Sequence, residues 1–222
     1  MRALPPDYDS DPGRWQSWES PRDIHDLIAP ELRGPILDIG CGNGRLASLL
    51  SNDVSWIGVD SSPTQLAANP YRPVVQADMR ALPFRHEAFA EVTHLWCLYH
   101  LPDPLEAITE AARVLRPGGR YFACSSARDN DPEIMYEQYP RSPFDAEEAA
   151  DIVAAVFDDV QVERWDRTFL PLKTRDEVRA YCRHHFIPTE RAEDAGIPLW
   201  LTKRGALVRA GKPLIADRPG GG

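Results

Sequence analysis

Three glycines within five positions form the stretch of this chain best suited to hold a ligand. Gly40, Gly42 and Gly44 directly follow a short apolar run, residues 36–39. Glycine adopts backbone dihedrals that other residues resist, and its missing Cβ lets a ligand lie against the main chain. Free N–H groups at the start of a following helix suit a carboxylate or phosphate. The stretch predicts a ligand cradle, although a tight strand-to-helix turn without a ligand uses the same residues.

Two acidic residues follow later apolar runs. Asp60 closes the run of residues 55–59, 20 residues after Gly40, where a carboxylate in a nucleotide-binding fold accepts hydrogen bonds from ribose hydroxyls. A plain helix cap for the segment that starts near Pro63 is the alternative. Asp78 follows the run of residues 73–77 and, taken alone, reads as a turn or cap residue.

A histidine follows the fourth apolar run, residues 89–96. Ligands in a parallel doubly wound sheet sit beyond the carboxyl ends of the strands, so Tyr99 and His100 should face the ligand. The ordinary pKa of histidine, near 6.5, makes His100 the candidate catalytic base. Packing at the strand end is the alternative for His100, and for Tyr99 core packing is the alternative to lining the pocket.

The glycine spacing is G-x-G-x-G, whereas a dinucleotide-binding turn reads G-x-G-x-x-G. Together with Asp38, the stretch resembles the first motif of the class I S-adenosylmethionine (SAM)-dependent methyltransferases, in the group called type 11. Residues 77–84 resemble the adenine-binding motif of that family, and residues 99–104 resemble its HHLPDP-like segment, with Tyr99 at the first position. Residues 115–119 resemble a structural signature, and the whole resemblance covers residues 30–126.

The resemblance implies a cofactor site for SAM, with S-adenosylhomocysteine as the product. It assigns the methionine moiety to Asp38, Gly40, Cys41, Gly42, Asn43 and Gly44. It assigns the ribose to Asp60 with its neighbour Ser61, and the adenine to Asp78 and Met79, preceded by Ala77. It places Leu95 and Trp96 where they close around the cofactor. No histidine or cysteine spacing predicts a metal site.

These residues need a scaffold of alternating strands and helices. We expect an α/β fold, a Rossmann-like doubly wound, mostly parallel seven-stranded sheet with helical cap elements. Helices are expected over residues 23–32, 45–50, 105–115, 145–157 and 174–185, and late strands over 158–165 and 205–209. The resemblance implies that the last strand lies antiparallel between the fifth and sixth.

Three segments divide the chain. Residues 35–215 are the expected methyltransferase domain, and residues 216–222 an expected flexible tail. Residues 1–34 form an N-terminal lid or cap segment. Its aromatic residues Tyr8, Trp15 and Trp18 suit either a lid over the site or a strap on the outside of the domain.

Composition restricts the partners. The formal net charge of −9 argues against a phosphate backbone as ligand, which needs clustered basic charge. There is no run of about 18 apolar residues and no apolar stretch at the N-terminus. We therefore expect a soluble cytoplasmic protein without a membrane partner. The four scattered cysteines are expected to be buried thiols.

The expected reaction is methyl transfer from SAM to an oxygen or nitrogen of a small, partly apolar molecule, such as a secondary metabolite. The N-P-P-Y type of motif for planar nitrogens is replaced by residues 98–101. Three alternatives stay open: a tRNA or rRNA methyltransferase with a basic groove, a SAM-binding protein without catalysis, and a nucleotide-dependent oxidoreductase. The glycine spacing counts against the last.

Overall fold

A computed structural model describes residues 24–135, 142–185 and 187–214. Its strands are β1 (Ile36–Ile39), β2 (Trp56–Asp60), β3 (Val74–Gln76), β4 (Phe89–Leu95), β5 (Leu115–Ser126), β6 (Asp158–Leu172) and β7 (Leu199–Gly211). Its α-helices are α1 (Ile24–Ile28), α2 (Pro63–Ala68), α3 (Pro104–Val114), α4 (Ala149–Ala154), α5 (Arg175–His184) and α6 (Arg191–Asp194). Three short 3-10 helices complete the set: η2 (Ala29–Glu31), η3 (Ala47–Leu49) and η4 (Leu98–His100).

The strands form one seven-stranded sheet in the order β3-β2-β1-β4-β5-β7-β6. Strands β1 to β5 pair in parallel, and β7 runs antiparallel to both β5 and β6. This confirms the expected doubly wound sheet and the antiparallel last strand. The chain order reverses direction between β1 and β4, which is where such sheets bind ligands.

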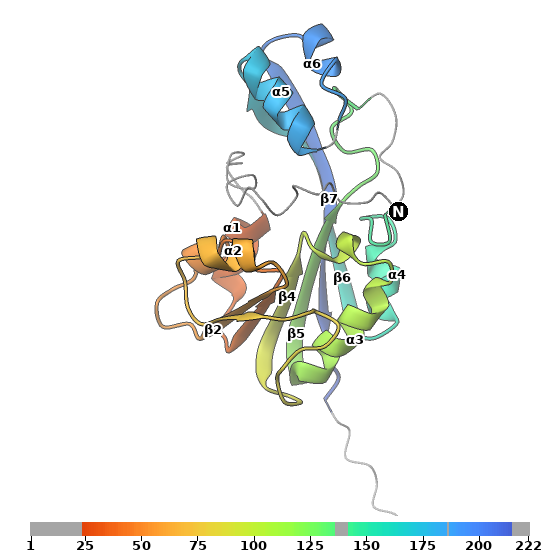
Figure 1. Ribbon diagram of the computed structural model, residues 1–222. Helices are drawn as coiled ribbons and strands as arrows, with labels where there is room; N and C mark the ends of the chain where they lie inside the picture. The colour runs from red at the N-terminus through yellow and green to blue at the C-terminus, as the bar shows by residue number, and fades with distance from the viewer. Residues whose placement is uncertain (1–23, 136–141, 186, 215–222) are drawn as a thin grey trace, which may run out of the picture.

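Two apolar layers cover the sheet because successive side chains of a strand point to opposite faces. On β1, Leu37 and Ile39 point into a core shared with α3 and α4, while Ile36 joins a second cluster with α1 and α2. Figure 1 shows α3 and α4 on one side of the sheet and α1 and α2 on the other. Residues 24–32 of the expected N-terminal segment thus pack on a sheet face; its aromatic leader lies outside the described residues, as does the expected tail, residues 216–222.

Three expected helices are shorter than the sequence indicated. Over residues 23–32, the described part forms α1 and then the 3-10 helix η2. After the glycines, residues 45–50 form turns and the 3-10 helix η3, because the Leu49 and Leu50 amides donate to carbonyls three residues back. The Ser48 hydroxyl also bonds a backbone carbonyl, a competing contact that disfavours helix. The expected helix over 145–157 begins with a turn, and only α4 is regular.

The late strands are longer than expected, and they carry a cap. Pairing of β5 with β7 ends at Ser126 and Gly205, yet β6 and β7 continue to pair with each other as far as Leu172 and Leu199. We call residues 166–185 and 187–204 the cap; Figure 1 shows it, with α5 and α6, rising beyond the carboxyl end of β5. Its apolar cluster is separate from the two sheet layers. The helix expected over 174–185 is confirmed as α5, which begins with a capping box of Thr174 and Glu177.

A buried polar network fixes the cap to the loop after β5. The Asp131 carboxylate is fully buried and pairs with Lys203 Nζ at 2.6 Å. Tyr181 of α5 donates its hydroxyl to Asp131 at 2.6 Å, and Asn130 donates to the same carboxylate at 2.7 Å.

Within the described residues, no helix is long and apolar enough to cross a membrane.

Candidate functional site

The glycine loop, residues 40–44, lies at the carboxyl end of β1, beside the point where the strand order reverses. The amides of Gly40 and Cys41 both donate to the Val59 carbonyl, at 2.8 and 3.0 Å, which holds the loop against the end of β2. Asn69 donates its side-chain amide to the Gly42 carbonyl at 3.0 Å from the other side. The loop is therefore fixed by long-range contacts before any ligand binds.

The three glycines of the loop have positive φ angles of 73°, 50° and 93°, but they face different surroundings. A Cβ on Gly40 would lie 2.6 Å from Cys97 Cβ, and one on Gly44 would lie 2.5 Å from Asn69 Oδ1. A Cβ on Gly42 would meet nothing nearer than Gln65 Oε1, at 3.7 Å. Gly40 and Gly44 are thus required by the protein's own packing, whereas Gly42 leaves room for an approaching group.

Gln65 marks the ligand side of the loop. Its side-chain oxygen is buried and has no hydrogen-bond partner among the described residues. Buried polar atoms are nearly always paired, so an orphan next to open backbone fits a bound polar ligand. Gln65 and Asn69 were missed by the sequence analysis, which assigned α2 no role in the site. The residues present at this loop fit a nucleoside-type cofactor.

Asp60, at the end of β2, joins the loop to α2. Its carboxylate accepts from the amides of Gly42 and Ser62, each at 2.9 Å. Its backbone carbonyl accepts from the Ala77 amide at 3.1 Å, so the end of β3 is held in the same place. A carboxylate oxygen can accept more than one hydrogen bond, so this group is of the type that accepts from ribose hydroxyls. Ser61 lies exposed beside it.

Asp38 lies deeper than its assignment to the methionine moiety suggested. Its carboxylate accepts from Thr93 Oγ1 at 2.8 Å and from Trp56 Nε1 at 3.3 Å, and the residue is 3% exposed. Burial raises the pKa of this carboxyl. These contacts brace β1 against β2 and β4 beneath the loop. Direct contact of Asp38 with a cofactor stays a prediction.

The expected adenine residues lie at the end of β3. Asp78 is exposed and forms an ion pair with Arg80 at 2.6 Å, which holds the pKa of this carboxyl below its usual range. Met79 is half-buried against the core shared with α3. Both remain predictions as adenine ligands, and Asp78 would have to share its charge between Arg80 and the ligand.

The end of β4 borders the other side of the loop. Leu95 is buried, and Trp96 has a φ of 59°, unusual for a residue with a Cβ. Cys97 donates its thiol to the Ile39 carbonyl at 3.4 Å. Burial raises the pKa values of the Cys97 and Cys41 thiols, so neither is a reactive thiolate. All four cysteines are buried and free, as expected from the sequence.

The candidate catalytic residues follow in η4. The rings of Tyr99 and His100 are 4.4 Å apart, and both residues are half-buried. The His100 amide donates to the Cys97 carbonyl at 3.1 Å, and this bond fixes the turn. Cys97 is also the residue that packs against Gly40. The fold therefore brings Tyr99 and His100 to the carboxyl edge that carries the glycine loop.

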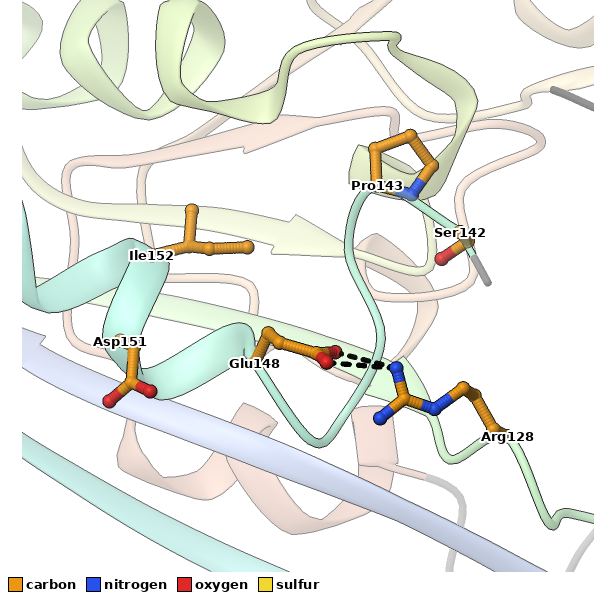
Figure 2. A pocket seen from close by; sticks show the side chains of 6 residues that line it. All are labelled: Arg128, Ser142, Pro143, Glu148, Asp151 and Ile152. Atoms are coloured by element: carbon orange, nitrogen blue, oxygen red, sulfur yellow. Dashed lines mark hydrogen bonds and ion pairs between the residues drawn. The ribbon is translucent and has the colours of Figure 1, made fainter. Parts of the chain in front are cut away.

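A separate surface pocket lies between the loop after β5 and α4. It has a volume of about 450 Å³ and is lined by Arg128, Ser142, Pro143, Glu148, Asp151 and Ile152 (Figure 2). The carboxylates of Asp145, Glu147 and Glu148 lie within 4.8 Å of one another, but Arg128 pairs with Glu148 at 2.8 Å and with Asp145 at 3.4 Å. Arg128 thus offsets part of the negative charge of these three carboxylates. The residues that line the pocket include none of the glycine loop.

Comparisons with known proteins agree with this geometry. Residues 37–123 match the model of a methyltransferase domain family. The chain is 42% identical over 97 residues to 27-O-demethylrifamycin SV methyltransferase of Amycolatopsis mediterranei, covering 38% of this chain and 36% of that protein. It is 29% identical over 133 residues to demethylmenaquinone methyltransferase of Symbiobacterium thermophilum, covering 52% of this chain and 51% of that protein.

Among solved structures, the YcgJ protein of Bacillus subtilis has the same fold, with a TM-score of 0.62, 19% identity, and coverage of 86% of this chain and 97% of that one. The chain spans only a third to a half of the two curated relatives. The matched part nevertheless contains the glycine loop, Asp60, Asp78 and the end of β4. Residues 37–123 therefore match a methyltransferase domain, and over this part the chain is similar to class I SAM-dependent methyltransferases.

Proposed function

We propose that the protein transfers a methyl group from SAM to an oxygen or nitrogen of a small, partly apolar molecule. The observation that carries this proposal is the glycine loop. The space beside the Gly42 Cα is open to a ligand, and the Gln65 side-chain oxygen next to it has no partner among the described residues. The Asp60 carboxylate accepts from the Gly42 amide next to it, and a carboxylate can accept several hydrogen bonds, including those of ribose hydroxyls. When bound, SAM supplies a methyl group already activated on a sulfonium.

The chain's own residues then have limited tasks. Methyl transfer in line requires the acceptor to be held against the methyl carbon, with water excluded. The residues that follow β4, Trp96 to His100, lie at the edge where this alignment takes place. His100 takes the acceptor's proton if the acceptor is a hydroxyl or a protonated amine.

The class of acceptor follows from charge and from the relatives. The two relatives are named for a rifamycin precursor and for demethylmenaquinone, both small molecules rather than nucleic acids. The net charge of −9 opposes a nucleic acid in the same way. We therefore place the acceptor among small metabolites with a substantial apolar part.

Calorimetric titration with SAM, S-adenosylhomocysteine and NAD tests the cofactor. We expect binding of both adenosyl ligands and none of NAD, and a loss of about tenfold to a hundredfold in affinity in Asp60→Ala. Asp53→Ala removes the same charge from an exposed turn and should bind like wild type. Equal affinities in both variants, or tight NAD binding alone, would refute the assigned site.

Replacing His100 tests the base. His100→Gln should keep the affinity for S-adenosylhomocysteine and lower turnover by about a hundredfold, the usual contribution of a positioned base. Turnover within about threefold of wild type would exclude proton transfer by His100 and leave it a role in packing the turn.

A further inference from the structure

The indole of Trp165 on β6 packs over a glycine of the neighbouring strand, β7. Gly205 of β7 is its cross-strand partner. A Cβ on Gly205 would lie 2.2 Å from Trp165 Cζ2 and 2.6 Å from the Ser125 carbonyl oxygen of β5. Only glycine therefore leaves space for the indole, which passes over β7 toward the middle of the sheet.

The indole reaches the edge that carries the glycine loop. Its ring centroid lies 6.0 Å from that of Trp96, at an interplanar angle of 73°, an edge-to-face contact. Trp96 has a positive φ, and the next residue, Cys97, packs on Gly40. A continuous path of contacts thus runs from β6 to the loop at the end of β1.

Trp165 is also unusual within its own strand. Residues 161–164 and 166–168 are exposed, while Trp165 is half-buried against the apolar cluster that contains Leu95 and Leu207. Trp96 is half-buried as well. The pair therefore keeps part of two large aromatic surfaces uncovered at the carboxyl edge of the sheet, beside the cofactor loop rather than inside the core.

We propose that Trp165, held against Trp96 by the absence of a side chain at Gly205, forms a wall of the acceptor site that selects a flat, conjugated ring over a puckered one. This proposal rests on the proposed function, because it needs the acceptor at this edge. A flat ring lies against an indole over its whole face, and such aromatic contacts are directional beyond the area they bury. A puckered ring of the same size makes fewer of these contacts.

The test compares two probes of equal carbon skeleton, 2-naphthol and decahydro-2-naphthol, with the full chain saturated with S-adenosylhomocysteine. Wild type should bind the flat alcohol about tenfold more tightly, which corresponds to the energy of one or two aromatic contacts. Trp165→Leu and Gly205→Ala should both bring this ratio close to one. Trp200→Leu changes an exposed tryptophan of β7 and should keep the wild-type ratio.

Each outcome has a separate meaning. An unchanged ratio in Trp165→Leu and Gly205→Ala, or no preference in wild type, overturns the aromatic wall. Failure of wild type to bind S-adenosylhomocysteine overturns the proposed function instead. Retained affinity for S-adenosylhomocysteine in Trp165→Leu shows that the variant is folded. Trp165→Phe, which keeps an aromatic face, should restore part of the ratio, whereas a packing role alone would not separate the two probes.

Discussion

The glycine loop and the cap are held in place by different kinds of contact. The loop is a short stretch held by backbone contacts to the ends of β1 and β2, and it leaves one side open at Gly42. The cap packs around its own apolar cluster, and Lys203 and Tyr181 join it to the fully buried carboxylate of Asp131 in the loop after β5. The difference is that the loop is fixed by a few hydrogen bonds to the end of β2 and to Asn69 and keeps an open side, whereas the cap is held by a buried apolar cluster and a buried ion pair.

The largest effect is expected from Gly40→Ala. The new Cβ would meet Cys97 at 2.6 Å, and alanine would have to adopt a φ of 73°. Overpacking and strain of this kind together cost about 4 kcal/mol in the free energy of unfolding. Denaturant unfolding checks this value, and binding of S-adenosylhomocysteine should be lost as well.

Gly42→Ala is the matched control, because its Cβ has 3.7 Å of room. Only the strain of positive φ remains, about 1 kcal/mol, so the variant should fold. Its affinity for S-adenosylhomocysteine should nevertheless fall strongly, since the methyl group occupies the ligand's approach. If Gly42→Ala binds like wild type, the open side of Gly42 is not the cofactor side.

The second-largest loss in free energy of unfolding is expected from a substitution in the cap. Lys203→Met removes the cation from Asp131, which is fully buried and still accepts from Tyr181 and Asn130. Breaking a buried pair on one side costs about 3 kcal/mol. Hydrogen exchange should show lost protection in α5 while the amides of β1 and β4 stay protected.

The double variant Lys203→Met with Asp131→Asn sharpens this result. It removes both charges, so most of the lost protection should return. If the sheet and the cap lose protection together in Lys203→Met, the two regions form one cooperative unit and the comparison between them fails.

These two regions also differ in how far the sequence could specify them. Gly40, Asp60 and Asp78 are recognisable because each follows a short apolar strand at a fixed spacing, and parallel strands bring their carboxyl ends to one edge. The contact of Asn69 with Gly42 and the passage of Trp165 over Gly205 depend on the register of strands and on partners 27 and 40 residues apart in the chain. No local pattern contains that register.

The lengths of β6 and β7 were underestimated for the same reason, because their extensions into the cap have no local sequence pattern. The part of the β6–β7 pairing that enters the cap includes Arg167 and Lys203, whose polar types do not indicate a strand. The strand there is stabilised by an apolar cluster with α5 and by the contacts of Asp131, both formed between distant segments. The helix α5 was predictable, since its capping box is local.

Acid should destabilise the sheet through a buried histidine, with a smaller effect than Gly40→Ala or Lys203→Met. His94 of β4 is fully buried, its Nδ1 lies 2.8 Å from the Tyr121 hydroxyl, and burial lowers its pKa to about 3. The unfolded chain binds this proton near pH 6.5, so stability falls as pH drops from 7 toward 3. Between pH 7 and pH 5 the loss from His94 amounts to about 2 kcal/mol.

His94→Asn removes this titration and keeps an acceptor for the Tyr121 hydroxyl. The free energy of unfolding of the variant should therefore depend less on pH over this range by about 2 kcal/mol. Asp38 works in the opposite direction, because its raised pKa makes the folded state take up a proton first on acidification. Asp38 is present in both wild type and His94→Asn, so its contribution cancels when their pH profiles are subtracted. Identical pH profiles would mean that His94 is protonated in the folded state.

The smallest effect, on both stability and cofactor affinity, is expected from Arg80→Ala. The ion pair with Asp78 is exposed on both sides, at 43% and 46%, so its loss should change the free energy of unfolding by less than about 0.5 kcal/mol. Asp78 would then be free to accept from an adenine amino group without sharing its charge. Calorimetry should show tighter binding of S-adenosylhomocysteine in Arg80→Ala, by a fewfold, and no such gain in the double variant with Asp78→Asn. A loss of affinity in Arg80→Ala would instead assign the guanidinium, not the carboxylate, to the ligand.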